Sequence, residues 1–148
     1  MIESQVAESL ALAASDVLET MFFCSVLAEV PVGTAPPKAV AARLPFSGAR
    51  SGVFSVRLTE GAAQVIAAGF LAEETREPSQ EQVAEVVCEL ANMMCGSVLS
   101  RLDRGAHFDL GSPALVEPAA LSAPGTVCRA FDIGDGEVAV FLRMDDPA

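Results

Sequence analysis

The amino-acid sequence predicts an α+β fold in which a mainly antiparallel sheet packs against two long helices. Apolar residues recur at three- and four-residue steps over residues 4 to about 28, and again over residues 79 to about 103, as in amphipathic helices. Elsewhere apolar and polar residues alternate, and the "GDG" at 134–136 joins two alternating stretches, which is typical of a β-hairpin. Helices and hairpins that are segregated along the chain favour an antiparallel sheet with helices against it.

The first part of the chain is expected to form a helix, a loop and a hairpin. One side of the helix over residues 4 to about 28 is made of Val6, Leu10, Ala13, Val17, Thr20 and Met21. The stretch "PVGTAPPK" (31–38) predicts a loop, because adjacent prolines interrupt both helices and strands. Residues 40–46 and 53–58 each alternate, and "SGARSG" separates them, so they are expected to pair as two strands.

Two further helices are expected in the middle of the chain. Thr59 can cap a helix that starts at Glu60, because its hydroxyl can accept a hydrogen bond from a free backbone N–H of the first turn. Ser79 then opens a longer helix, and Gln82 follows three residues later in the capping-box arrangement. This longer helix should run to about Asp103.

The last part of the chain is expected to contribute about three strands. The stretch "RGAHFDLGSP" turns the chain, and residues 114–116 then predict a short strand. Residues 126–133 and 137–144 flank the "GDG" and predict a hairpin. The expected order is therefore one helix, two strands, two helices and about three strands.

Composition and charge restrict the classes of protein and partner. The 148 residues are expected to form a single domain, 1–148, and the 51% hydrophobic content is enough for a real core. The net charge of -11 makes nucleic acids and anionic membrane surfaces poor partners, because like charges repel. A protein with a basic surface is a better match.

Targeting signals and cysteine spacing favour a reduced, cytoplasmic protein. No stretch approaches the roughly 18 consecutive apolar residues of a membrane span, and Glu3 and Glu8 replace the basic lead-in of a secretory signal. The cysteines at 24, 88, 95 and 128 form no CxxC pair, so they indicate packed thiols rather than disulfides or a zinc site. His107 is the only histidine, so a Ser-His-Asp or Cys-His set would depend on one residue in a turn.

The helix expected over 79–103 carries an unusual polar stripe. Its core side is made of Val86, Val87, Leu90, Met93, Met94 and Val98. A sector of about 60° on the opposite side holds Glu85, Glu89, Asn92, Gly96 and Asp103. A solvated helix face is the simplest explanation, but such a face is usually rich in Lys, Glu and Gln. Asn and Gly are poor helix formers, which favours a functional reason for them.

Glu89 and Asn92 suggest a chemistry for this stripe. They are three residues apart, so their side chains are neighbours on the helix surface. A carboxamide can accept one hydrogen bond and donate another, so Asn92 could orient a water molecule without deprotonating it. Phosphoryl transfer depends on such positioning more than on a strong base. Glu89 could pair with a lysine of a substrate that supplies the phosphate and the metal.

The stretch "ELANMMCG" (89–96) resembles the Glu-x-x-Asn-Met-x-x-Gly signature of the CheX/CheC/FliY family of chemotaxis phosphatases. These proteins hydrolyse the aspartyl phosphate of CheY-type receiver domains. "FSGARSGVFSVRL" (46–58) and "FDLGSPALV" (108–116) are similar to the family's Gly-x-x-x-Gly hairpin and to its segment after the signature. The length and the single signature look most like CheX, and the resemblance implies a CheX/CheC-like fold.

The resemblance also implies roles for individual residues. Glu89 matches the acid that pairs with the receiver's lysine, and Asn92 matches the amide that aligns the attacking water; these are the expected catalytic residues. Glu85, Met93 and Gly96 are the expected partner-binding residues, with Gly96 at a position of close approach. Pro113 matches a structural proline. The resemblance implies no cofactor in this chain, because Mg²⁺ would come with the phosphorylated receiver domain.

The first helix resembles the second in part. "SDVLETMFF" (15–23) can be aligned with "CELANMMCG" (88–96), which matches Asp16 with Glu89, Glu19 with Asn92 and Met21 with Met94. The first helix is then a degenerate copy of the second, or the similarity is a coincidence between two amphipathic helices. Glu19 cannot donate from an amide, so no second active site is expected.

Alternatives to an active phosphatase remain open at this point. A non-catalytic receiver-binding adaptor could use the same helix for docking without accelerating hydrolysis. A structural subunit of the flagellar switch is less favoured, because the 148 residues leave no room for a second domain. Resemblance to CheX implies a homodimer, whereas resemblance to CheC implies a monomer.

Overall fold

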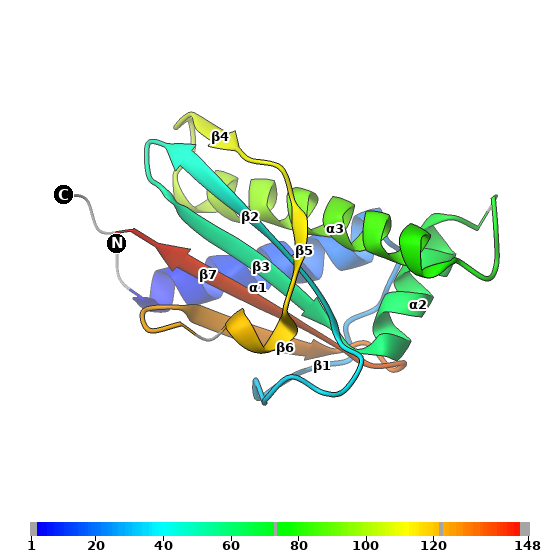
Figure 1. The fold of residues 1–148 in the computed structure, drawn as a ribbon. Coiled ribbons are helices and arrows are strands. Elements are labelled where there is room, and N and C mark those ends of the chain that lie inside the picture. The colour runs from blue at the N-terminus through cyan, green and yellow to red at the C-terminus, as the bar shows by residue number, and fades with distance from the viewer. Residues whose placement is uncertain (1–2, 73, 122, 146–148) are drawn as a thin grey trace.

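The protein forms one antiparallel sheet with helices packed on it, as expected for an α+β fold (Figure 1). The computed structural model describes residues 3–72, 74–121 and 123–145. Within these residues the elements are α1 (Glu3–Met21), β1 (Ala28–Val30), β2 (Val40–Gly48), β3 (Gly52–Leu58), α2 (Glu60–Phe70), α3 (Gln80–Leu102), β4 (Phe108–Leu110), β5 (Ala114–Val116), the 3-10 helix η1 (Pro118–Leu121), β6 (Val127–Asp132) and β7 (Glu137–Met144).

The strands are arranged almost symmetrically about the middle of the sheet. Their order is β1-β6-β7-β3-β2-β4, with β5 also paired to β2, and all of these pairs are antiparallel. The hairpins β2–β3 and β6–β7 meet along β3 and β7. Each half of the chain therefore runs from a long helix through a short strand to a hairpin, and each short strand pairs with the hairpin of the other half.

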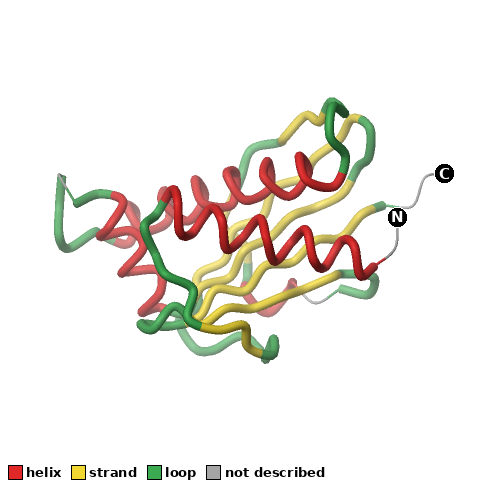
Figure 2. Tube along the Cα trace, turned by 180° about the vertical axis from the view of Figure 1, so that it is seen from behind, coloured by secondary structure: helices red, strands yellow, loops and turns green. Residues whose placement is uncertain are grey.

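The core lies between the sheet and the helices α1 and α3, which cover the same face (Figure 2). The alternation in the strands places every second side chain in this core, as the sequence predicts. Its strand side chains include Ala42, Leu44, Phe46, Phe54, Val56, Leu58, Val138, Val140 and Leu142. The shorter α2, which the sequence predicts to start at Glu60, lies at one end of the sheet and packs against α3, so three helices, two of them long, accompany the sheet.

The first helix is shorter than the sequence predicts, and the expected end near residue 28 is wrong. It ends at Met21, and Phe23 adopts a left-handed backbone with φ of 55°. The N–H of Cys24 donates to the carbonyl of Leu18 at 2.8 Å, which satisfies a free carbonyl at the helix end. The chain then pairs with β6 as β1. This pairing is made with residues about 100 positions away, so the helical periodicity of the segment could not indicate it.

Strand β4, like β1, was not expected, because the sequence predicts only a turn at these residues. Within "RGAHFDLGSP", β4 pairs with the end of β2. The ring of Phe108 meets the ring of Phe46 edge-on, with centroids 6.2 Å apart. Three residues are too few to show an alternation, so this strand is defined by its pairing with β2 and not by its own pattern.

The other face of the sheet is covered only in part. The 3-10 helix η1 crosses this face in front of the strands in Figure 1, and Leu121 packs there with Ala41, Ala130, Ala139 and Phe141. These five residues form a second, smaller apolar cluster. The rest of this face carries polar and charged side chains, among them Arg43, Ser55 and Arg143, together with the apolar Pro45 and Val53.

Candidate functional site on helix α3

The start of α3 is formed by the capping box that the sequence predicts. The N–H of Ser79 donates to the side-chain oxygen of Gln82 at 2.9 Å, and the N–H of Gln82 donates to the hydroxyl of Ser79 at 3.1 Å. Glu81 in the first turn and Arg101 in the last turn both suit the helix dipole. The helix ends at Leu102, with Asp103 as its C-cap residue, as expected.

The buried side of α3 determines which residues can face a partner. The side chains packed against the sheet and neighbouring helices are Val83, Val86, Val87, Leu90, Ala91, Met94, Cys95, Val98 and Leu99. A helix with so wide an apolar side cannot rotate without exposing several of them, which costs roughly 1.5–3 kcal/mol for each large aliphatic side chain. The opposite side, with the expected site residues, is therefore held outward.

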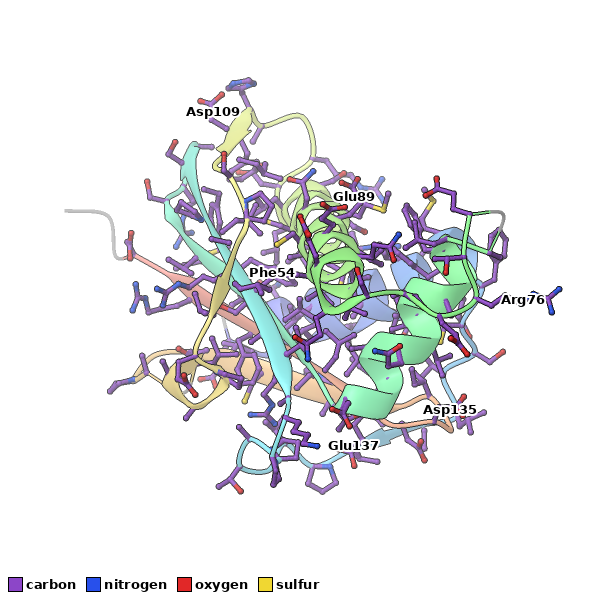
Figure 3. All side chains as sticks on the ribbon, turned by 45° about the vertical axis from the view of Figure 1, so that its right-hand side comes forward. Phe54, Arg76, Glu89, Asp109, Asp135 and Glu137 are labelled. Carbon is purple, nitrogen blue, oxygen red and sulfur yellow. The ribbon has the colours of Figure 1, made fainter. Side chains whose placement is uncertain are left out.

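The predicted catalytic residues lie together on this outward side. Glu89 is exposed on the outer surface of α3, on the side away from the sheet residue Phe54 (Figure 3). Asn92 is half-buried one turn further along, and Glu85 is exposed one turn earlier. Among the hydrogen bonds and ion pairs of the described residues, none engages the side chains of Glu89 or Asn92. Both polar groups are therefore available to a partner.

Gly96 leaves an open position next to Asn92. A Cβ atom built onto Gly96 would meet no atom within 4 Å. Packing inside this protein therefore does not require a glycine there, and a glycine in mid-helix costs roughly 0.5–1 kcal/mol relative to alanine. Met93 is half-buried and packs against the edge of the core. Its position fits the expected packing role, and part of its surface stays accessible.

Three of the four cysteines are not suited to nucleophilic chemistry. All four are free, and Cys95 is fully buried beside the core. Burial raises the pKa of the Cys95 thiol to about 12, and it also raises the pKa of Cys88. The pKa of Cys24 is raised by burial and, to a lesser degree, by the charge of Asp135. Because the thiolate is the reactive form, these three thiols are weak nucleophiles at neutral pH.

We predict that Cys95 is protected from alkylation in the folded protein. Its raised pKa favours the neutral thiol, and burial excludes the reagent. Iodoacetamide at pH 8, followed by peptide mass spectrometry, should leave Cys95 unmodified until urea unfolds the chain. The half-buried Cys128 is the internal comparison. Equal labelling rates before and after unfolding would contradict this prediction.

The raised pKa of Cys95 also affects the pH dependence of stability. Since its pKa in the folded protein lies above the unfolded value, the contribution of Cys95 to stability should fall only as the pH rises from about 9 toward 12.

His107 lies outside the polar stripe of α3. Its Nε2 is 3.0 Å from an oxygen of Asp109, and both side chains are largely exposed. Figure 3 shows Asp109 at the tip of the segment that carries β4. Within the described ranges, no group of three or more His, Cys, Asp or Glu side chains is placed to hold a metal ion.

The apolar composition of α3 is explained by its place in the core. Among the described helices, it is the one that is long and apolar enough to cross a membrane by length and composition alone. Half of the apolar segment is buried inside the protein, and core helices pass the same test.

Helix α1 carries a partial counterpart of the α3 stripe. The alignment of the two helices matches buried with buried positions: Leu10, Ala13, Ala14, Val17 and Leu18 with Val83, Val86, Val87, Leu90 and Ala91. The matched pair Met21 and Met94 departs from this agreement, because Met21 is 49% exposed and Met94 is fully buried. The internal repeat therefore stays a hypothesis beside a coincidence between two amphipathic helices.

The counterpart on α1 differs from the α3 stripe in charge and in shape. Asp16 accepts a hydrogen bond from Arg101 at 3.3 Å, so the counterpart of Glu89 already has a basic partner. Glu19 replaces the carboxamide, and the position of Gly96 is taken by Phe23, whose ring is exposed. The sequence shows the two acids but not the ion pair, because Asp16 and Arg101 are brought together only by the packing of α1 on α3.

Comparison with solved structures shows what this fold is similar to. A chemotaxis protein CheX from Vibrio vulnificus matches with a TM-score of 0.77 and 21% identity over 98% of this chain and 99% of that chain. A complex of CheX with CheY, BeF3 and Mg²⁺ from Borrelia burgdorferi matches with a TM-score of 0.72 and 22% identity, over 94% and 97%. FliY from Thermotoga maritima is more distant, with a TM-score of 0.61 and 13% identity, over 97% and 90%.

The comparison with protein families is more specific than these structural similarities. No match was found among the curated proteins. The model of the family described as "Chemotaxis phosphatase CheX" matches residues 40–129, which is more than half of the chain and contains the Glu89–Gly96 signature. The chain therefore belongs to the CheX family of chemotaxis phosphatases.

Proposed function

We propose that this protein removes the phosphoryl group from the aspartyl phosphate of a CheY-type receiver domain. The observation that carries the proposal is the placement of Glu89 and Asn92. They are neighbours on the outward side of α3, neither side chain has a partner among the described residues, and open space follows at Gly96. Family membership and the CheX–CheY complex of Borrelia burgdorferi support the choice of partner.

Asn92 is proposed to place the attacking water. Hydrolysis forms a bond between the water oxygen and phosphorus and breaks the bond between phosphorus and the aspartyl oxygen, which releases inorganic phosphate and a free carboxylate. The carboxamide oxygen can accept a hydrogen bond from the water while its N–H group donates to a phosphoryl oxygen. Half-burial restricts the Asn92 side chain, so less freedom is lost when the water is aligned.

Glu89 is proposed to hold the receiver in register through an ion pair with a lysine. An exposed ion pair contributes only about 0–1 kcal/mol, but its contribution grows when docking excludes water. Glu85 lies one turn away and has the same charge, so it extends the acidic surface along α3. The net charge of -11 favours a partner that presents a basic group. The Mg²⁺ ion would come with the receiver domain.

The function is tested by following phosphate release. The purified protein is mixed with phosphorylated receiver domains from the same organism, and free phosphate is measured against the receiver alone. Faster release with at least one receiver supports the proposal. If the protein binds a phosphorylated receiver without faster phosphate release, it is a receiver-binding adaptor and not a phosphatase. The proposal also places the protein in the cytoplasm, where receiver domains act.

A Gly96→Ala substitution separates the needs of the helix from those of the partner. The methyl group meets no atom within 4 Å, so the free energy of unfolding should rise by roughly 0.5–1 kcal/mol. The same methyl group lies beside Asn92, where the receiver is proposed to approach closely. The KM for the phosphorylated receiver should therefore rise several-fold. Thermal unfolding and phosphate-release kinetics measure the two effects.

Gly69→Ala is the matched control for this prediction. Gly69 lies in α2 and is exposed. A Cβ atom built onto it would come no closer than 4.0 Å to another atom, the carbonyl oxygen of Phe22. This variant should gain stability in the same way while its KM stays unchanged. If Gly96→Ala also leaves the KM unchanged, close approach at Gly96 is not part of docking.

A further inference from the structure

Three arginines gather on the face of the sheet that α1 and α3 leave uncovered. The chain has 9 Lys and Arg residues against 20 Asp and Glu, so three cations on one face are a local concentration of positive charge, beside the single acid Glu137 of β7 that interacts with Arg57. Arg43 lies on β2 opposite Ser55 of β3, Ser55 lies opposite Phe141 of β7, and Arg143 lies opposite Val53. The register therefore places Arg43 on one neighbouring strand and Arg143 on the other, with Ser55 on the strand between them.

A small cavity occupies this position. Its volume is about 40 Å³, and Arg43, Ser55, Thr126, Phe141 and Arg143 line it together with Leu121 of η1. Two guanidinium groups, two hydroxyl groups and the side chain of Phe141 therefore line one cavity. A space of this size holds a small polar group or a few water molecules, because one water needs about 10–15 Å³ of such volume.

The guanidinium groups of Arg43 and Arg143 and the hydroxyl of Ser55 have no partner among the described residues. Within residues 3–72, 74–121 and 123–145, Arg43 and Arg143 take part in no ion pair or hydrogen bond, and no partner is found for the hydroxyl of Ser55. Ser55 is nevertheless only 4% exposed. No fully buried side-chain N or O atom among the described residues lacks a hydrogen-bond partner, so the unpaired hydroxyl of Ser55 is accessible from the cavity.

Arg57, the third arginine on this face, differs from Arg43 and Arg143 because it has partners within the protein. Its guanidinium donates to the carbonyl of Gly33 at 3.0 Å and lies over the ring of Phe141, 5.4 Å from the centroid. It therefore holds the loop before β2 against the sheet and packs on the ring of Phe141. Arg43 and Arg143 have no comparable structural role.

We propose that this cavity binds an oxyanion group, a carboxylate or a phosphate, held by Arg43 and Arg143. Guanidinium groups match the planar geometry of carboxylates and bind phosphate oxygens with paired hydrogen bonds. The hydroxyl of Ser55 donates a further hydrogen bond from the bottom of the cavity. The cavity is lined from the face of the sheet on which η1 lies. Helices α1 and α3 cover the opposite face (Figures 1 and 2), so this site is separate from the proposed phosphatase surface.

Nuclear magnetic resonance titration of the ¹⁵N-labelled full chain tests the proposal. One arm uses inorganic phosphate, as a free anion, and the other uses a capped tetraglutamate peptide, as an acidic protein segment. At least one probe should give saturable shifts of the amides of Ser55 and Thr126 and of the Arg43 and Arg143 side chains. The tighter probe identifies whether the oxyanion is free or carried by a peptide.

Two variants make the test specific to the cavity. Arg43→Gln with Arg143→Gln should weaken binding of the responding probe by about tenfold to 100-fold, as expected for the loss of charged hydrogen bonds. Arg76→Gln with Arg104→Gln removes the same number of positive charges from exposed loops and should leave binding unchanged. Circular dichroism and thermal unfolding confirm that the double variant is folded.

Several results would overturn the proposal. The proposal is wrong if neither probe gives saturable shifts, or if the shifts are equal for all arginines. It is also wrong if the double variant binds the probe as tightly as the unmodified protein. The same conclusion follows if sedimentation shows that the double variant loses self-association while probe binding is unaffected, because the arginines then serve an interface between copies of the chain.

Discussion

Replacing Asn92 with alanine is expected to lower the accelerated dephosphorylation of a phosphorylated receiver by about 100-fold or more, to near the rate of the receiver alone. The variant keeps the acidic docking surface but loses the carboxamide that places the water. The kcat of phosphate release should therefore fall while the Kd for the phosphorylated receiver changes little. Single-turnover phosphate release and calorimetric titration measure these two quantities.

Stability distinguishes this loss from unfolding. Alanine is the better helix former, so the Asn92→Ala variant should unfold at the same or slightly higher free energy, by at most about 0.7 kcal/mol. Gln80→Ala, at the exposed start of α3 and on another side of the helix than the stripe, is the matched control and should retain full activity. Substantial activity in Asn92→Ala would contradict a single active site and would direct attention to Asp16 and Glu19 on α1.

Replacing Glu89 with lysine is expected to weaken docking of the receiver by about tenfold to 100-fold, because an attractive contact with the receiver's lysine becomes a repulsive one. Glu89 is exposed and has no partner among the described residues, so the fold should be unaffected. The KM should rise much more than the kcat falls. Rising ionic strength should weaken docking of the unmodified protein, and this salt dependence should diminish in the variant.

Glu77→Lys is the matched control for the charge. Glu77 is exposed in the loop before α3, and its side chain takes part in no hydrogen bond or ion pair among the described residues. The substitution changes the net charge by the same amount, so it isolates the position of the charge from its sum. If both variants raise the KM equally, the receiver responds to net charge and not to Glu89. If neither does, the docking role of Glu89 is wrong.

Those parts of the fold that depend on neighbouring residues could be predicted from the sequence. The capping box of Ser79 and Gln82, the cap at Thr59 and the alternation in β2, β3 and β7 all involve residues two to four positions apart. The strands β1 and β4 could not be predicted. Each has three residues, and each exists because a distant strand offers it hydrogen bonds.

The candidate site divides in the same way. Helical spacing alone places Glu85, Glu89, Asn92 and Gly96 on one side of α3, opposite the apolar side. Spacing cannot show that the apolar side is covered and the polar side is not, nor that the space at Gly96 stays empty. It also cannot show that Arg101 reaches Asp16 from another helix.

The sequence by itself determined the helices, the hairpins, the polar stripe and, through the signature at 89–96, the family resemblance, because each is written in residues that are close along the chain. Only the tertiary structure decided where α1 ends, which acids remain free, and that Arg43, Ser55 and Arg143 enclose one cavity. Those features depend on contacts between residues up to about 100 positions apart. Such contacts follow from the packing of the whole chain, and no local pattern encodes them.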